Sequence, residues 1–299
     1  MNGSANGSNP TRPRVTIVTP VLNGARFVGG AVESVLAQSY PGVEYVVVDG
    51  GSRDGTLETL QRYGDRVRVL VREGAGQAEA LNIGFAEAAG EVLGFLNADD
   101  LYLPDAIAAA VDALDAHPEA SFVYGEADHI DESGDVLGPY PTEAFAPDAL
   151  ARRCIVCQPA AFFRADAFRQ IGGVDPALHY ALDYDLWIRL SRVGAPVAFA
   201  RKIALSRMHP ANKTLGSRRA AYEETMKVLK RHYDYVPYDW VVAHANHVAD
   251  RRDGFFQESR ASRLNVLASL AVGLFINSKQ WGRYLRDWLA HRRFRTNRN

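Results

Sequence analysis

The sequence predicts an α/β protein, in which a mostly parallel sheet carries helices on both faces and a helical region follows at the C-terminal end. Two observations support this prediction. Runs of β-branched residues alternate with helix-patterned segments from Arg14 to Glu126, and strands that alternate with helices usually pair in parallel. From Leu215 on, the pattern is wholly helical.

Five segments of the N-terminal part are apolar and β-branched without polar alternation, which is typical of strands buried on both faces. They are residues 14–20, 43–51, 67–73, 91–97 and 120–126. Four segments with helical spacing lie between or after them: residues 25–39, 54–63, 78–90 and 104–118. We expect Asp54 to cap the second helix and Gly90 to end the third, and Pro104 suits a helix start.

After Glu126 the rhythm changes. Residues 128–138 predict a hairpin that turns at Ser133-Gly134. Residues 158–173 predict a short strand, a helix and a glycine stop, and residues 180–194 predict an amphipathic helix.

The composition is that of a globular protein, with 47% hydrophobic and 23% charged residues among 299. The net charge of −1 conceals an asymmetry: residues 260–299 contain nine basic residues and one acid, so they carry +8, while the first 259 residues carry −9. An acidic body excludes nucleic acid as an expected partner, whereas a basic tail suits phosphate-rich or membrane surfaces.

Cys154 and Cys157 form a CxxC pair without a second cysteine pair, which excludes a four-cysteine zinc site. We interpret them as two buried thiols in a reduced cytosol. Residues 1–13 are polar, and we expect them to be disordered rather than a signal peptide. No apolar run reaches the roughly 18 residues that a membrane span needs, so a cytoplasmic location is expected.

Polar residues gather where the predicted strands end, which is where parallel sheets bind ligands. These residues are Thr19, Asn23, Asp49, Ser52, Asn97, Asp99 and Asp100. The adjacent acids Asp99 and Asp100 are costly to bury without a cation. Because the next helix starts near Pro104, helix capping is a poor explanation for the pair. Mg²⁺ and Mn²⁺ prefer carboxylate oxygens and bridge to phosphates, so a metal with a phosphorylated ligand is predicted.

The first strand is followed by "TPVLNGARF" instead of G-x-G-x-x-G, and no P-loop motif occurs, which disfavours dinucleotide dehydrogenases and P-loop enzymes. Three longer stretches occur in order: "VTIVTPVLNGARFVGGAVESVLAQSYPGVEYVVVDGGSRDGT", "GQAEALNIGFAEAAGEVLGFLNADD" and "GGVDPALHYALDYDLWIRL". Together they resemble family 2 glycosyltransferases of the GT-A fold. The resemblance covers residues 14–214. It implies a catalytic domain there, with a nucleotide-binding half (14–125) and an acceptor-binding half (126–214), and leaves residues 215–299 as a helical region with a basic tail.

The resemblance implies a nucleotide-sugar site made of Thr19, Pro20, Asn23, Asp49, Ser52, Gln77, Asn82, Asn97, Asp99 and Lys213. In it, Asp49 would accept a hydrogen bond from the base, although a turn-forming aspartate is the alternative. Asn82 would approach the nucleotide and sugar, or would merely brace the cleft.

The family's D-x-D metal motif is altered here, because Asn97 occupies its first position. The divalent cation, Mn²⁺ or Mg²⁺, would therefore bind Asp100 and Asp99. His209 would contact either this cation or the diphosphate, and Lys213 the phosphates; a histidine without a ligand role is the alternative for His209.

Asp183 matches the aspartate of the family's catalytic Glu-Asp pair, and Leu182 replaces the glutamate. The resemblance implies that Asp183 is the general base. Two alternatives stay open: an acid that is simply favoured at a helix N-terminus, and Asp185 as the base.

The resemblance thus implies an inverting, metal-dependent hexosyltransferase that moves a sugar from a nucleoside diphosphate, with UDP favoured, to an acceptor hydroxyl. A glycan or lipid-linked glycan in bacterial cell-surface polysaccharide or glycolipid synthesis is the expected acceptor, by family analogy. The alternatives are a nucleotide-sugar binding protein without turnover and a sugar nucleotidyltransferase, although the Gly- and Arg-rich loop of the latter is missing. A glycoside hydrolase would use paired carboxylates but need no nucleotide cleft.

Residues 263–276 are apolar but too short to span a bilayer, and residues 281–298 mix aromatic side chains with arginines. This pattern suits a segment that lies on an anionic membrane, at its inner face. It equally suits a helix that packs on the catalytic domain or on a second copy in a homodimer.

Overall fold

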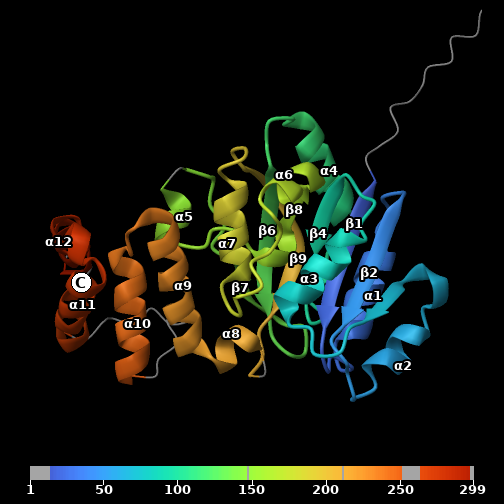
Figure 1. Ribbon diagram of the computed structural model, residues 1–299, viewed down its shortest axis with the longest axis horizontal. Helices are drawn as coiled ribbons and strands as arrows, with labels where there is room; N and C mark the ends of the chain where they lie inside the picture. The colour runs from blue at the N-terminus through green and yellow to red at the C-terminus, as the bar shows by residue number, and fades with distance from the viewer. Residues whose placement is uncertain (1–13, 147, 211, 251–262, 297–299) are drawn as a thin grey trace, which may run out of the picture.

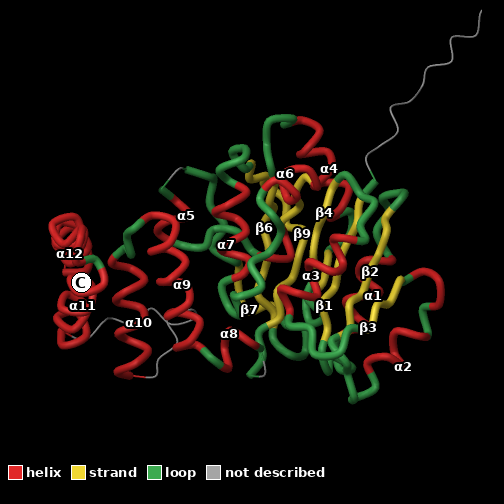
Figure 2. The backbone as a smooth tube through the Cα atoms, in the orientation of Figure 1, coloured by secondary structure: helices red, strands yellow, loops and turns green. Residues whose placement is uncertain are grey.

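The computed structural model describes residues 14–146, 148–210, 212–250 and 263–296. A twisted sheet with helices on both sides forms the main body, and helices from the C-terminal part extend it at one end (Figures 1 and 2). The disorder expected for residues 1–13 falls outside the described residues. The predicted fold class is confirmed, with a mixed sheet whose N-terminal half is parallel.

Within the described residues the sheet has nine strands, ordered β3-β2-β1-β4-β8-β6-β9-β5, with β7 beside β6. Their bounds are β1 Val15–Val21, β2 Val43–Asp49, β3 Arg68–Val71, β4 Val92–Phe95, β5 Leu101–Tyr102, β6 Phe122–Ile130, β7 Val136–Pro139, β8 Ala161–Arg164 and β9 Val197–Arg207. The predicted hairpin is formed by β6 and β7, and its turn residue Gly134 has a φ of +98°.

The pairing differs from a simple parallel sheet at one place. Strand β8 lies between β4 and β6 and is antiparallel to both, so the fifth predicted strand does not join the fourth. Strand β9, which the sequence pattern did not reveal, pairs in parallel with β6 and antiparallel with β5. Through this pairing β5, directly after the acid pair, and the end of β9 lie side by side.

The helices cover both faces of this sheet. Their bounds are α1 Val28–Leu36, α2 Thr56–Gln61, α3 Gln77–Ala86, α4 Ala106–Ala116, α5 Ala149–Arg152, α6 Ala165–Gln170, α7 Leu182–Leu190, α8 Lys213–Gly216, α9 Arg218–Tyr233, α10 Tyr238–Asp250, α11 Arg263–Ile276 and α12 Trp281–Thr296. Short 3₁₀ turns occupy Gly64–Arg66, Gln158–Ala160 and Ser278–Gln280.

Two predicted helix boundaries are wrong. Gly55, with a φ of +96°, occupies the N-cap position of α2, and Asp54 one residue earlier accepts hydrogen bonds from the N–H groups of Thr56 and Ala25. Helix α3 ends at Ala86, before Gly90. Gly90 is instead needed for close packing, because a Cβ there would lie 2.6 Å from the backbone nitrogen of Thr16.

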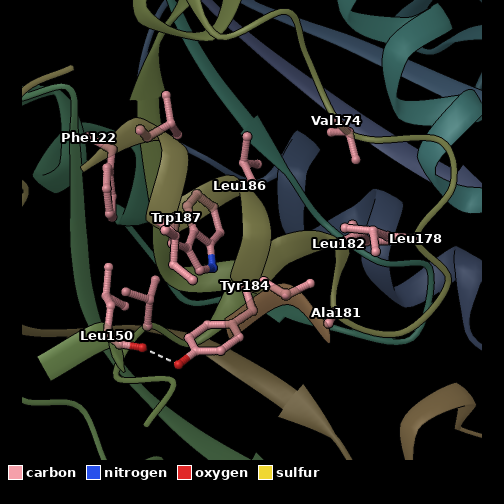
Figure 3. Packing of buried hydrophobic residues seen from close by; sticks show 14 of the residues in the cluster. Phe122, Leu150, Val174, Leu178, Ala181, Leu182, Tyr184, Leu186 and Trp187 are labelled. Carbon is pink, nitrogen blue, oxygen red and sulfur yellow. Dashed lines mark hydrogen bonds between the residues drawn. The ribbon is translucent and has the colours of Figure 1, made fainter. Parts of the chain in front are cut away.

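Alternate residues of the buried strands point to opposite faces and build two cores. One core joins the sheet to α1, α2 and α4, and the other joins it to α3, α6, α7, α9, α10 and α12. Trp187 of α7 is fully buried in the second core, and its ring lies 5.3 Å from that of Phe122 and 6.2 Å from that of Phe95, centroid to centroid (Figure 3). This packing fixes α7, the helix that carries Asp183, against the sheet.

The C-terminal helices are joined to this body by specific contacts. Asn277, between α11 and α12, donates a hydrogen bond to Val236 O and accepts one from Val236 N–H, and Tyr235 donates to Asp287 of α12. No helix among the described residues is long and apolar enough to cross a membrane.

Candidate active site

A cavity of about 760 Å³ opens at the carboxyl ends of β1 and β4 and reaches the N-terminal end of α7 and the sides of α9 and α10. This volume lies within the usual range for pockets that bind small molecules and cofactors. Most of the predicted site residues line it: Pro20, Asn23, Gln77, Asn97, Asp99, Asp100, Asp183, His209 and Lys213. Thr19, Asp49, Ser52 and Asn82 do not.

Two of the predicted nucleotide-sugar contacts are engaged elsewhere. The Thr19 side chain is fully buried, and its hydroxyl lies 2.9 Å from that of Tyr45. The Asn82 amide donates to Val174 O at 2.8 Å and accepts from Val174 N–H at 2.9 Å. Asn82 therefore braces the loop that leads into α7, as its alternative interpretation anticipated.

Asp49 is fully buried, and its two carboxylate oxygens differ. Oδ1 accepts hydrogen bonds from the N–H groups of Gly51 and Ser52 at 2.8 and 2.7 Å, which is the turn-forming role. Oδ2 has no partner within the described part of the chain. A buried carboxylate oxygen without a donor is costly, but Asp49 does not line the cavity, so the structure shows its turn-forming role and leaves base binding as a proposal. Ser52 accepts from Asn23 N–H and so ties together the loops after β1 and β2.

The two carboxylates of the acid pair differ in their surroundings. Asp100 is hydrogen-bonded within the protein, whereas Asp99 is open to the cavity. Asp100 is 3% exposed, and its oxygens accept from Arg207 N–H at 2.8 Å and from the Asn97 amide at 3.2 Å. Burial raises the pKa of Asp100 well above its ordinary value, and the adjacent Asp99 carboxylate raises it further. Asp99 faces the cavity, with Oδ2 3.0 Å from His209 Nε2.

The side chains predicted to bind the metal fit the implied cation only in part. Nowhere in the described ranges do three His, Cys, Asp or Glu side chains come together as a ready metal site, so the predicted set of Asp99, Asp100 and His209 is not preassembled. Asp99 and His209 alone fit an open site, because their side chains are 25% and 10% exposed and present a carboxylate and an imidazole side by side. A divalent cation held by one or two protein ligands takes its remaining ligands from water and substrate phosphates.

A chain of amides lies next to the open pair. Gln77 donates to Asn97 at 2.9 Å, Asn97 donates to Gln158 at 2.6 Å, and Gln158 donates to Phe95 O at 2.6 Å. Lys213 donates to Gln77 at 3.2 Å. The network fixes Asn97, the residue in place of the expected first aspartate, as a neutral brace. Gln158 was missed because nothing in its local sequence marks it.

The two aspartates of α7 have different surroundings. Asp183 lines the cavity, and burial raises its pKa to about 6. Asp185 is fully buried beneath the helix, where Oδ2 lies 2.6 Å from Arg189 Nε and Oδ1 lies 2.7 Å from His232 Nε2. Although burial raises the pKa of Asp185, His232 and Arg189 outweigh that effect and lower it. Asp185 thus ties α7 to α9, and Asp183 is the one of the two that faces the cavity.

The predicted thiols are unpaired, with Cys157 buried and Cys154 half-buried. Burial raises the pKa of Cys154 to about 12 and that of Cys157 well above its ordinary value, so both stay protonated.

Comparisons with known proteins agree with this geometry. The family model described as glycosyl transferase family 2 matches residues 16–172. The chain belongs to glycosyl transferase family 2.

Two relatives show how far the sequence similarity extends. An uncharacterized glycosyltransferase of Rickettsia conorii is 34% identical over 211 residues, which is 65% of this chain and 34% of that protein. Chondroitin synthase of Escherichia coli is 28% identical over 222 residues, or 73% of this chain and 32% of the relative. The chain spans about a third of the length of both.

Solved structures of other glycosyltransferases share the fold. TarS residues 1–349 of S. aureus, in complex with UDP-GlcNAc, superposes with a TM-score of 0.63 at 16% identity, covering 88% of this chain and 81% of that one. The mannosyltransferase PcManGT of Pyrobaculum calidifontis, in complex with GDP-Man and Mn²⁺, has a TM-score of 0.57 at 19% identity, covering 88% and 75%.

Much of the cavity lies beyond the matched residues 16–172. One side of α9 and the start of α10 form a wall that sequence reasoning missed: Arg218, Ala221, Tyr222, Thr225 and Trp240. The four residues of α9 have the spacing of any helix packed on a core, so nothing in the sequence marks them as residues that line a cavity.

Glu224 of α9 was also missed. Its carboxylate accepts hydrogen bonds from three consecutive backbone N–H groups, those of His179, Tyr180 and Ala181, at 2.5–3.1 Å. This loop directly precedes Asp183. Helix α9 therefore holds the loop that presents Asp183 to the cavity.

Proposed function

We propose that this protein transfers a sugar from a nucleoside diphosphate donor to an acceptor hydroxyl, with inversion at the anomeric carbon. UDP is the favoured nucleoside diphosphate. The observation that carries the proposal is Asp183, a carboxylate on the cavity wall whose pKa is raised to about 6. A base with a pKa near the working pH accepts a proton efficiently and is still ionised at neutral pH.

The donor occupies the side of the cavity formed by the loops after β1, β3 and β4. Asp49 Oδ2 is a buried acceptor without a partner within the described residues, and it would receive the N–H of the base. The amide chain from Gln77 to Gln158 lies beneath the diphosphate and sugar, and Lys213 supplies a positive charge for the phosphates.

Asp99 and His209 would hold a divalent cation, Mn²⁺ or Mg²⁺, whose charge offsets the charge that develops on the departing diphosphate. Asp100 would support this pair from below, since its own oxygens are engaged by Arg207 and Asn97. The mannosyltransferase complex with GDP-Man and Mn²⁺ supports this assignment by analogy.

The acceptor occupies the other side of the cavity, against α7, α9 and α10. Tyr180, Tyr222 and Trp240 line it, and aromatic faces pack well on the apolar face of a sugar ring. Asp183 takes the proton of the acceptor hydroxyl while the hydroxyl oxygen bonds to the anomeric carbon. The bond from that carbon to the diphosphate oxygen breaks on the opposite face, and the nucleoside diphosphate leaves.

We therefore assign the nucleotide half to residues 14–125 and the acceptor half to residues 126–214, extended by α9 and α10. A glycan or lipid-linked glycan acceptor in cell-surface polysaccharide or glycolipid synthesis agrees with the aromatic wall and with the name of the E. coli relative.

A donor screen tests the proposal. The full chain is incubated with UDP-, GDP- and dTDP-sugars and Mn²⁺ or Mg²⁺, and the nucleoside diphosphate released is measured. We expect release from one donor group by wild type and its loss in Asp183→Asn. Tight donor binding without release from any of these donors, even with mixed glycan acceptors, would instead support a binding protein without turnover.

A further inference from the structure

In the helical hairpin α11–α12 at one end of the molecule (Figure 1), α11 carries a row of buried polar residues, beside which Val266, Leu270 and Leu274 pack against the core. Asn265, Ser269 and Asn277 of the α11 segment are all buried, at a spacing that places them on one side. Asn265 bonds to Asn246 of α10, and Ser269 O accepts from Tyr284 of α12. Gly273 on the same side makes room for the Tyr284 ring, since a Cβ there would lie 1.9 Å from it.

The opposite side of α11 is apolar and faces outward. Leu267 is 58% exposed, Val272 38% and Phe275 84%, and Ala268 and Ala271 lie exposed on the same face. Spacings of one, three and four residues place all five on one side of the helix. Exposed helices of globular proteins usually present polar residues to water. A contiguous apolar outer face on α11 therefore indicates an interaction surface.

The same hairpin adds Trp281, 61% exposed, and Leu289, 39% exposed, both on α12. With those of α11, they are five of the ten exposed large hydrophobic side chains in the described residues, although the hairpin is only a small part of the chain. The exposed large hydrophobic side chains are therefore concentrated on one hairpin.

The exposed charged residues of the hairpin itself are cationic, although the exposed Asp234 contacts Gln280, directly before α12. Lys279, Arg283 and Arg286 are exposed, whereas Asp287, the one acid between residues 263 and 296, is engaged by Tyr235 O–H at 2.7 Å and Tyr238 N–H at 3.0 Å. Arginine 292, 293 and 295 follow in the sequence of α12.

We propose that the outer side of the α11–α12 hairpin, with Leu267, Val272 and Phe275 of α11 and Arg286 and Leu289 of α12, docks on the surface of a bilayer that contains anionic phospholipid. Exposed apolar and aromatic side chains beside arginines are the composition of segments that lie in the membrane interface. Pairing with a second copy about a two-fold axis fits less well, because it would bring the cations of one hairpin against those of the other.

Docking here would bring the acceptor side of the cavity towards the bilayer. Helix α10 lies between the two: its Trp240 lines the cavity, and its Asn246 contacts α11. The docking proposal itself does not depend on catalysis and is tested by binding alone.

The test is co-sedimentation of the full chain with vesicles of phosphatidylcholine, alone or mixed with phosphatidylglycerol. We expect binding to the mixed vesicles, little binding to phosphatidylcholine alone, and weaker binding as salt is raised, because surface charge is screened. Replacing Arg286 by Gln should weaken binding about fivefold.

The apolar part is tested with Phe275→Ser, which should weaken binding about tenfold or more by removing an aromatic side chain from the interface. Because Phe275 is 84% exposed, the variant should fold normally. Matched controls are Val136→Ser on β7, where the side chain is 62% exposed, and the pair Arg62→Gln and Arg66→Gln on the exposed side near α2. These controls should bind like wild type.

Sedimentation velocity completes the experiment. A wild-type protein that ignores anionic vesicles at low salt overturns the proposal. A wild-type dimer that Phe275→Ser converts to a monomer, without vesicle binding by either, would show instead that the face is an interface between copies. Equal loss of binding in the control variants would also contradict the assignment of the surface.

Discussion

Replacing each α7 aspartate by Asn separates the base from the structural acid. Asp183→Asn keeps the shape of the side chain, and its Oδ1 can still accept the bond from Tyr184 N–H at 2.8 Å, but it cannot take a proton. Loss of a general base typically lowers the rate by about 10²–10⁴, which corresponds to about 3–5 kcal/mol of activation free energy. The donor KM should barely change, because Asp183 is assigned to the acceptor.

Stability should move in opposite directions in the two variants. The folded-state pKa of Asp183, about 6, is raised above the ordinary value, so its protonation favours the folded state at low pH. This contribution is lost as pH rises through 6, where the charged form is disfavoured. Asp183→Asn should therefore melt at a higher temperature than wild type at pH 8, and the difference should vanish near pH 4.

Asp185→Asn should instead lower the stability of the protein at neutral pH. It removes the partner of Arg189 and His232 and leaves them without their buried carboxylate, a change that typically costs about 3–5 kcal/mol. Because the pKa of Asp185 is lowered in the folded state, its contribution is present at neutral pH and fades as pH falls through the acidic range below about 4. The Asp185→Asn molecules that remain folded should turn over the donor at the wild-type rate.

The assays are nucleoside diphosphate release, with kcat and KM for donor and acceptor, and thermal melts from pH 4 to pH 8. In wild type, kcat/KM should fall below about pH 6 as Asp183 becomes protonated. Near wild-type turnover by Asp183→Asn, together with an inactive but well-folded Asp185→Asn, would refute the assignment.

Three further predictions concern the rest of the cavity. Asp99→Ala should abolish the stimulation of turnover by Mn²⁺ and weaken Mn²⁺ binding in the presence of UDP, followed by electron paramagnetic resonance; unchanged binding would remove Asp99 from the metal site. Glu224→Gln should lower kcat about tenfold or more with little change in donor KM, because a neutral amide holds three backbone N–H groups less firmly than a carboxylate; an unchanged kcat would show that this clamp does not position Asp183. Trp240→Ala should raise the acceptor KM and leave donor hydrolysis by water unchanged; a rise in donor KM alone would place Trp240 on the donor side.

The sequence predicted well what is local. The strands β1 to β4 and the helices between them follow from apolar runs and helical spacing, and the polar strand ends that line the cavity follow from the parallel arrangement. Asp183 was predicted from the resemblance to the family's catalytic Glu-Asp pair, and helical spacing added only that it lies at the start of a helix.

What the sequence did not reveal depends on contacts between distant segments. Strand β8 enters between β4 and β6, and β9 reaches Asp100 through Arg207 N–H, more than a hundred residues away in sequence. This contact engages Asp100 within the protein and leaves Asp99 facing the cavity, whereas the altered motif predicted a cation on both Asp100 and Asp99. Glu224 and Trp240 could not be recognised for the same reason, because only the packing of α9 and α10 brings Glu224 to the loop before Asp183 and Trp240 to the cavity wall.

The most direct test of the central claim is the configuration of the sugar that leaves the enzyme. With an α-linked UDP-sugar and water as acceptor, ¹H nuclear magnetic resonance can follow the anomeric proton of the first product before it equilibrates. Displacement by an acceptor activated by Asp183, opposite the departing diphosphate, predicts that the β anomer forms first. Initial release of the α anomer would contradict the account.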